Sequence, residues 1–252
     1  MIQVKAIHHR YGKQTTLQDI SVDIQKHQIT AIIGPNGAGK STLLNVMAGL
    51  LEKQSGEIFI DNVNIESMKR DEISKVLAIL KQTQNLDLRI TVSDLISFGR
   101  YPYSKGNLTN EDHAHINAAI SYLHLEPLKE KYIHELSGGE RQRAYIAMIL
   151  AQDTEYLFLD EPLNNLDIKH AVETMNIIKS LVEKLNKTVL IVLHDLNMVS
   201  SHADNVIALK NGRMVSHGDV KTVMTQKTLK DVYDYEFEII KHEDKQICLY
   251  NT

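Results

Sequence analysis

The chain has 252 residues, enough to bury a large hydrophobic core in one domain or in two small ones. Its net charge of −4 provides no general basic field for nucleic acid. A single cysteine, Cys248, excludes an internal disulfide framework and a cysteine-based zinc site, and no apolar run approaches the roughly 20 residues that a membrane-spanning helix needs. If the protein serves a membrane, we expect it to do so from the aqueous side, through a partner.

The first segment is predicted to form antiparallel strands. Apolar residues alternate over residues 2–6 and again over residues 20–24, and no apolar signal region precedes them. Tyr11 lies in the turn between these strands. Its ring can pack at a strand end, or it can stack on a purine base, a contact worth about 1–3 kcal/mol per base in single-strand nucleic-acid sites. A phosphate-binding pattern further along the chain favours stacking.

That pattern covers residues 34–42 and fits the phosphate-loop motif G-x-x-x-x-G-K-[ST]. The β-branched apolar run over residues 29–33 predicts a buried strand before it. Leu43, Met47 and Leu50 recur at helical spacing after it, so we expect a helix from the end of the loop. The motif residues are Gly34, Pro35, Asn36, Gly37, Ala38, Gly39, Lys40, Ser41 and Thr42.

A strand, a glycine-rich loop and a helix in this order surround one point with backbone N–H groups, which suits a polyphosphate. Lys40 is predicted to reach the β- and γ-phosphates, and Ser41 to offer its hydroxyl to Mg²⁺. A chance glycine turn before a helix is the alternative, but the complete strand–loop–Lys–Ser–helix order argues against it. The sequence therefore predicts a site for a nucleoside triphosphate.

The next segments predict a short strand near residues 58–60 and a buried strand over residues 76–80. Gln82 follows the second strand. A glutamine at the carboxyl edge of an α/β sheet can ligate Mg²⁺ or hold a water molecule, and it can equally be a solvated surface side chain. Residue chemistry alone leaves both interpretations open.

Residues 91–125 have a helical pattern, with capping-box spacing at Thr91 and Asp94 and again at Thr109 and Asp112. Residues 98–103, Phe-Gly-Arg-Tyr-Pro-Tyr, connect the two predicted helices as a plain loop or as an exposed contact surface. Further along, Ser137 and Glu140 form another capping box, which opens the helical run over residues 141–151. Gly138 and Gly139 in its first turn leave the N–H groups bare, so we expect a second anion-binding surface there.

Two later strand ends carry polar side chains. Asp160 and Glu161 follow the buried strand over residues 156–159, where Asp160 is predicted to hold Mg²⁺ and Glu161 to act as general base toward the attacking water. His194 follows the strand over residues 188–193. A lone histidine at a strand edge is usually structural, but here it would be one more polar group at an edge of this kind, where it could contact a γ-phosphate. A strand near residues 207–209 and a hairpin within residues 236–250 complete the chain.

Together these motifs resemble the ATP-binding subunit of an ABC transporter, over residues 11–218. Residues 34–42 resemble the Walker A loop, residues 136–140 the signature motif and residues 156–161 the Walker B strand. The single-residue matches are Gln82 to the Q-loop glutamine, Asp167 to the D-loop aspartate, His194 to the switch histidine and Tyr11 to the adenine-stacking aromatic.

The resemblance implies an α/β fold: a RecA-like P-loop NTPase core with an antiparallel β subdomain and an α-helical subdomain inserted near residues 85–153, all in one domain over residues 1–252. It implies ATP and Mg²⁺, with Gln82 joining Ser41 and Asp160 at the metal and joining Glu161 and His194 in hydrolysis. It also implies a head-to-tail dimer, in which Ser137, Gly138 and Gly139 of one copy close on the ATP bound at Lys40 of the other. Glu140 and Asp167 are further residues that it implies in nucleotide binding. Permease subunits at the cytoplasmic face of the membrane, an extracytoplasmic substrate-binding protein and no nucleic acid complete the implied partners.

Within that family, residues 98–103 and 194–197 resemble importers of ferric siderophores, haem or cobalamin. Two positions depart from common patterns: Lys81 stands where a proline often precedes the Q-loop glutamine, and Asn164-Asn165 stands where many relatives carry Ser-Ala. Another importer or an exporter, and an ABC ATPase acting on nucleic acid, are the alternatives. The second usually has two cassettes or basic arms, which this chain lacks. A kinase on the same loop would leave residues 136–140 without a purpose.

Overall fold

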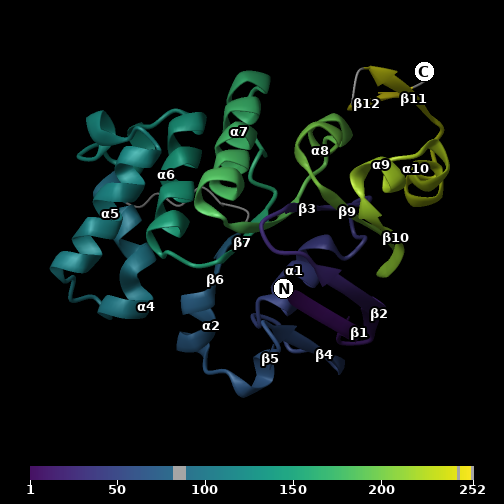
Figure 1. Ribbon diagram of the computed structural model, residues 1–252, viewed down its shortest axis with the longest axis horizontal. Helices are drawn as coiled ribbons and strands as arrows, with labels where there is room; N and C mark the ends of the chain where they lie inside the picture. The colour runs from purple at the N-terminus through teal and green to yellow at the C-terminus, as the bar shows by residue number, and fades with distance from the viewer. Residues whose placement is uncertain (82–88, 243–244, 251–252) are drawn as a thin grey trace. The chain divides into compact units, whose positions relative to one another are not determined.

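A computed structural model describes residues 1–81, 89–242 and 245–250 of the chain (Figure 1). The chain divides into two compact units. The first unit contains residues 1–69 and 188–252, and the second contains residues 70–187. Gln82 and the expected start of the helical insertion, near residue 85, lie outside the described residues. Within the described part of the chain, no helix has the length and apolar character needed to cross a membrane.

An antiparallel sheet begins the first unit, as the alternating pattern predicts. Its strand order is β2-β1-β4-β5. Ile2 pairs with Ile24 on one side and with Ile60 on the other, so that apolar side chains share one face of the sheet and are buried there. The strands are β1 (Ile2–Tyr11), β2 (Gln14–Ile24), β4 (Ser55–Ile60) and β5 (Val63–Asn64).

Four further strands of the first unit lie in the order β10-β9-β3-β8. The central strand β3 is parallel to both of its neighbours, while β10 is antiparallel to β9. Every residue of β3 and β8 is buried, as expected for parallel strands covered on both faces. The strands are β3 (Ile29–Ile33), β8 (Thr188–Val192), β9 (Asn205–Lys210) and β10 (Arg213–Asp219).

The helices of the first unit are short, and the last ones were not predicted. Their buried residues include Leu229 and Val232 on α10, which packs against β9 and β10. The C-terminal hairpin is present as predicted and lies against α8 (Figure 1). The elements are α1 (Lys40–Met47), α8 (Leu196–His202), α9 (Val220–Val223), α10 (Gln226–Tyr233), β11 (Phe237–His242) and β12 (Lys245–Tyr250), with a 3₁₀ turn η1 (Ile65–Ser67).

The second unit combines two parallel strands with helices. Strand β6 (Leu77–Leu80) pairs with β7 (Tyr156–Asp160), and α3, α5 and α6 pack on one another (Figure 1). The helices are α2 (Arg70–Val76), α3 (Val92–Ser97), α4 (Tyr101–Ser104), α5 (Asn110–Tyr122), α6 (Gly138–Ala151) and α7 (Ile168–Leu185), with 3₁₀ turns η2 (Phe98–Arg100), η3 (Glu126–Leu128) and η4 (Ile133–Glu135).

The three capping boxes are confirmed, with reciprocal bonds at the starts of α3, α5 and α6. The helix after the phosphate loop is shorter than predicted. It ends at Met47, because Gly49 adopts a φ of 68° that stops a helix, and Leu50 is therefore half-exposed outside it. Val76, predicted to open a strand, is instead the last residue of α2.

Candidate nucleotide-binding and catalytic site

The predicted phosphate loop lies in the first unit, between the carboxyl end of β3 and the start of α1. Lys40 is the first residue of the helix and is only 5% exposed. Its Nζ donates hydrogen bonds to the carbonyl oxygens of Gly34 and Pro35, at 2.9 and 3.1 Å. The ammonium group therefore lies inside the curl of the loop, where the oxygens of a polyphosphate can replace these two carbonyls.

His194 and the phosphate loop belong to the same sheet edge. Strand β8 is parallel to β3, with Ile32 paired to Val192, so the residues that follow both strands emerge at one edge. His194 is exposed there, and Asp195 caps α8 by accepting hydrogen bonds from the backbone N–H groups of Asn197 and Met198. The carboxyl edge of parallel strands is where α/β sheets bind ligands.

Tyr11 ends β1 with 53% of its surface exposed. The Tyr11 ring already contacts the imidazole of His9. The two rings are perpendicular, and their centroids lie 4.7 Å apart. Nδ1 of the buried His9 bonds the carbonyl of Glu52 at 2.8 Å and so must carry the proton. The Tyr11 ring is thus supported by a fixed imidazole and still has exposed surface for stacking.

One of the predicted metal residues, Asp160, and the predicted base, Glu161, are neighbours in the second unit. Asp160 is the last residue of β7 and is 6% exposed, and Glu161 follows it. Nδ2 of Asn164 donates to Oε2 of Glu161 at 2.5 Å, and the Asn164 N–H donates to the Glu161 carbonyl at 3.3 Å. Asn164 therefore orients the predicted base. This role was not predicted, because the sequence indicated only that Asn164-Asn165 replaces the Ser-Ala of many relatives.

The signature residues form the start of α6. The Ser137 hydroxyl accepts from the Glu140 N–H at 3.3 Å and donates to Oε2 of Glu140 at 2.7 Å, and the Ser137 N–H reaches the same oxygen at 2.9 Å. These bonds, led by the hydroxyl of Ser137, hold the pKa of Glu140 below its usual value. The Ser137 hydroxyl thus has a carboxylate partner that any incoming phosphate must replace.

His170 connects two predicted site residues and was not predicted itself. The carboxylate of Asp167 accepts hydrogen bonds from the backbone N–H and from Nδ1 of His170, both at 2.8 Å, and the backbone bond is the main reason that the pKa of Asp167 is lowered. On its other side, the imidazole fills the space next to Gly139. A Cβ at Gly139 would lie 2.2 Å from Cδ2 of His170. His170 therefore joins the start of α7 to the first turn of α6.

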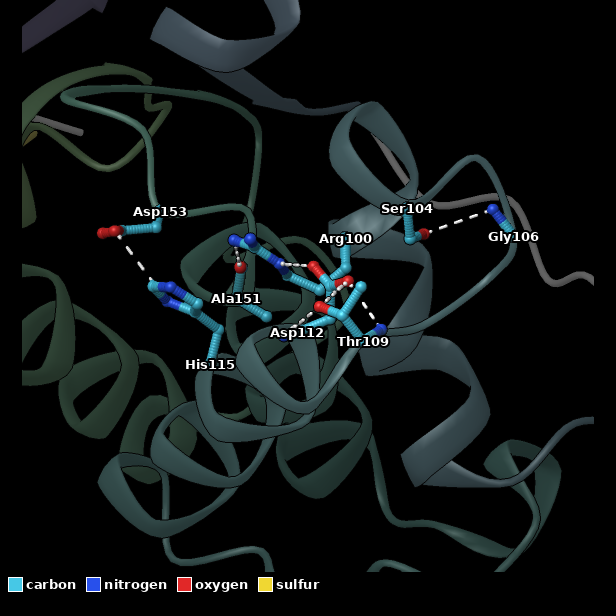
Figure 2. A network of polar contacts seen from close by, with 8 residues as sticks. All are labelled: Arg100, Ser104, Gly106, Thr109, Asp112, His115, Ala151 and Asp153. Atoms are coloured by element: carbon cyan, nitrogen blue, oxygen red, sulfur yellow. Dashed lines mark hydrogen bonds and ion pairs between the residues drawn. The ribbon is translucent and has the colours of Figure 1, made fainter.

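Residues 98–103 divide into a buried and an exposed part. Gly99 and Arg100 are buried, and a Cβ at Gly99 would lie 2.1 Å from the carbonyl oxygen of Met148. Arg100 binds Asp112 and the carbonyl of Ala151, as Figure 2 shows. By contrast, the rings of Phe98 and Tyr101 are 53% and 59% exposed. Instead of a plain loop, the segment is helical, and Phe98 and Tyr101 are exposed on it.

Each unit thus gathers its own set of predicted residues. The first brings the phosphate loop and His194 to one sheet edge and holds Tyr11 at the end of β1. The second places Asp160 with Glu161 at the end of β7, and it links Asp167 to Gly139 through His170. Gln82 lies outside the described residues.

The chain is similar to known proteins of one family. The ABC transporter family matches residues 17–164. The petrobactin import ATP-binding protein YclP of Bacillus subtilis is 50% identical over 250 residues, which cover 99% of each chain. The iron(3+)-hydroxamate import ATP-binding protein FhuC of the same organism is 38% identical, over 95% of this chain and 90% of its own.

Among solved structures, the chain is similar to the ATP-binding cassette MJ0796 in a dimeric, post-hydrolysis state bound to ADP and phosphate. The TM-score is 0.75 with 27% identity, over 87% of this chain and 99% of that one. Parallel strands with a phosphate loop at their edge are consistent with the fold of these cassettes. This chain belongs to the ABC transporter family and is an ATPase of that family.

Proposed function

We propose that the chain binds and hydrolyses ATP to power the import of iron–siderophore complexes through a partner permease. The observation that carries this proposal is the phosphate loop with Lys40 folded into it, in a chain that shares half of its residues with a petrobactin import protein over nearly its full length. A second relative imports iron(3+)-hydroxamate, which favours ferric siderophores over haem or cobalamin as cargo. Other importers, and exporters, are the alternatives.

In this proposal residues 34–42 bind the phosphates of ATP. The exposed ring of Tyr11 stacks on adenine, and Lys40 leaves the carbonyls of Gly34 and Pro35 for the β- and γ-phosphates. The exchange preserves two charge-assisted bonds of the ammonium group. The buried ammonium group of Lys40 therefore keeps hydrogen-bond partners when ATP binds.

Mg²⁺ would be held by oxygen ligands from Ser41, Gln82 and Asp160. Asp160 fits this role, since its carboxylate ends a wholly buried strand and hard oxygen donors are what Mg²⁺ prefers. When bound, the ion neutralises charge on the β- and γ-phosphates. Glu161, oriented by Asn164, takes a proton from the attacking water, and His194 and Gln82 contact the γ-phosphate or orient that water.

A second copy of the chain is the proposed partner at the signature surface. Ser137, Gly138, Gly139 and Glu140 of one copy would close on the ATP of the other, with Asp167 beside them. The N–H groups at the start of α6 and the absence of a side chain at the exposed Gly138 support an approach of this kind. The related cassette MJ0796, which forms a dimer with ADP and phosphate, supports it as well.

The proposed permease contact is the exposed aromatic surface of Phe98 and Tyr101, on a helical subdomain built from α3 to α6. Exposed aromatic rings such as these are typical anchors of protein interfaces. The buried Arg100 fixes the backbone that carries both rings. The chain would then act peripherally at the cytoplasmic face of the membrane, with an extracytoplasmic protein delivering the cargo.

Purified protein tests the ATPase part of this proposal. Glu161→Gln should bind ATP like the wild type, lose turnover and accumulate as an ATP-bound dimer, while Lys40→Ala should lose affinity for ATP. Gel filtration with ATP, phosphate release and nucleotide titration give the three readouts. Turnover by Glu161→Gln near the wild-type rate would remove Glu161 as the base, and unchanged affinity in Lys40→Ala would remove the phosphate-loop site.

A further inference from the structure

Gly34, the first residue of the phosphate loop, is held from three directions. Its N–H donates to the Tyr233 hydroxyl at 3.1 Å, and its carbonyl oxygen accepts from Nζ of Lys40 at 2.9 Å. The third side is closed by β9, because a Cβ on Gly34 would lie 2.2 Å from the carbonyl oxygen of Leu209. The φ of Gly34 is 146°, which side chains disfavour. The start of the loop therefore has a specific, externally supported conformation.

Two of these three supports, Tyr233 on α10 and Leu209 on β9, are also linked to each other by hydrogen bonds. Lys210, the residue after Leu209, donates from Nζ to the carbonyl of Asp231 and to Oδ1 of Asp234, both at 2.6 Å. These bonds fix the C-terminal end of α10 to the end of β9. Tyr233 lies on that last turn, and its ring packs edge-on against Phe237 with centroids 5.7 Å apart. The hydroxyl that meets Gly34 is thus carried by an anchored helix end.

The C-terminal segment is held at its far end as well. Side-chain atoms of Asn197, on α8, exchange two hydrogen bonds with the backbone of Cys248, at 2.8 and 3.3 Å. Ser200 bonds the backbone of Gln246 in the same manner. Helix α8 begins directly after His194 and Asp195. Residues 226–250 therefore contact the phosphate loop through Tyr233 and the helix behind His194 through the hairpin.

The two bonds at Gly34 differ in what ATP does to them. In the proposed binding of ATP, Lys40 turns from the Gly34 carbonyl toward a phosphate, so this support competes with the nucleotide. The bond from the Gly34 N–H to Tyr233 does not compete with a phosphate, because it points to α10. A loop held in its binding conformation before the ligand arrives has a higher affinity, since no ordering cost is added at binding.

We propose that Tyr233 is a positioning residue for ATP binding, whose hydroxyl preorganises the phosphate loop through the Gly34 amide. The inference rests on the proposed binding of phosphates by residues 34–42 and adds the C-terminal helix α10 to the nucleotide site. Tyr233 touches no phosphate itself in this arrangement. Its effect is on affinity, not on the chemical step.

The test compares Tyr233→Phe with Tyr235→Phe in the full-length chain. The first removes the hydroxyl that binds Gly34; the second removes a hydroxyl from a half-exposed ring on the same segment and leaves that bond in place. For Tyr233→Phe we expect the Kd values for ATP and ADP to rise together by about threefold to tenfold, the range that loss of one hydrogen bond converts to. The kcat at saturating ATP should stay unchanged, and hydrogen exchange of the Gly34 amide should accelerate. Tyr235→Phe should neither raise the Kd values nor accelerate hydrogen exchange of the Gly34 amide.

Three results would overturn the inference. These are an unchanged Kd with only a lowered melting temperature, a reduced kcat with unchanged Kd, and equal effects of the two variants. Lys40→Ala, measured alongside, separates this failure from a failure of the site itself. If Lys40→Ala weakens binding and Tyr233→Phe does not, the phosphate loop stands and Tyr233 has a structural role alone.

Discussion

The guanidinium of Arg100 donates from Nε to Oδ1 of Asp112 at 2.8 Å, and each side chain of this pair is only 4% exposed. Nη1 of Arg100 also donates to the carbonyl of Ala151 at 3.0 Å, at the end of α6 (Figure 2). Asp112 in turn caps α5 together with Thr109. One buried ion pair therefore ties η2, α5 and the C-terminal end of α6 together in the second unit.

This pair predicts an acid-sensitive stability. Backbone and side-chain bonds, first from Thr109 and then from Arg100, lower the pKa of Asp112 from 3.8 to about 2. A depressed carboxyl pKa contributes stability above the unfolded pKa and loses it as the pH falls through the folded one. The stability advantage of the wild type over Asp112→Asn should thus be full above about pH 4 and disappear toward about pH 2.

Urea unfolding of both proteins at a series of pH values measures this difference. Asp71→Asn is the matched control, because Asp71 pairs with Lys105 at 2.7 Å on the exposed surface, where water and salt screen the charges. Its effect should be smaller above about pH 4, where the Asp112 contribution is full. A constant difference between wild type and Asp112→Asn from pH 5 to pH 2 would contradict the role assigned to the pair.

The contact between Gly139 and His170 predicts a rescue. Gly139→Ala places a methyl group against the imidazole and should destabilise the protein by about 1–3 kcal/mol, as overpacking does. In the double variant Gly139→Ala/His170→Ala the ring is absent, so the methyl group meets no imidazole. The double variant should therefore be more stable than the sum of the two single effects predicts, by most of the loss seen in Gly139→Ala. Thermal unfolding of the four proteins forms the cycle. Simple additivity would show that His170 does not restrict position 139.

Asn164 should influence catalysis and leave binding unaffected. Its amide holds Oε2 of Glu161, so Asn164→Ala allows the predicted base to leave its orientation and should lower kcat by about tenfold or more. The KM for ATP should change little, because the hydrogen bonds that Asn164 makes among the described residues go to Glu161. Steady-state kinetics of Asn164→Ala against Asn165→Ala measure this. A raised KM with unchanged kcat would contradict the assignment.

Ser137→Arg should block dimer closure and spare nucleotide binding by the single chain. The long cationic side chain would stand at the start of α6, where the other copy's ATP is proposed to dock. In the Glu161→Gln background, light scattering with ATP should give a monomer for Ser137→Arg and a dimer for Glu111→Arg, which places the same cationic side chain in the first turn of α5. A dimer in both would argue against the signature surface as the contact.

Local sequence signals were sufficient for much of the fold. The capping boxes at Thr91, Thr109 and Ser137 were predicted because both partners of each box lie three residues apart in the chain. The strand–loop–helix order around Lys40 was predicted for the same reason, since every part of the motif is contiguous.

Contacts between distant residues could not be predicted in this way. Tyr233 meets Gly34 across 199 positions, and nothing in the alternation of either segment indicates the partner. Arg100 is similar: the six residues around it look like an exposed aromatic connection, yet burial of its guanidinium depends on Asp112 and on the end of α6. His170 is separated from Gly139 by a strand and a loop, and only the packed structure reveals that one excludes a side chain from the other.

Uptake of radiolabelled iron tests the central claim most directly. Cells lacking this chain would be given iron as petrobactin, hydroxamate and enterobactin complexes, with plasmid-borne wild type or Glu161→Gln. We predict that uptake of at least one complex is lost without the chain, restored by the wild type and not restored by Glu161→Gln. Unchanged uptake of every complex in the deletion strain, or equal restoration by Glu161→Gln, would contradict ATP-driven siderophore import by this protein.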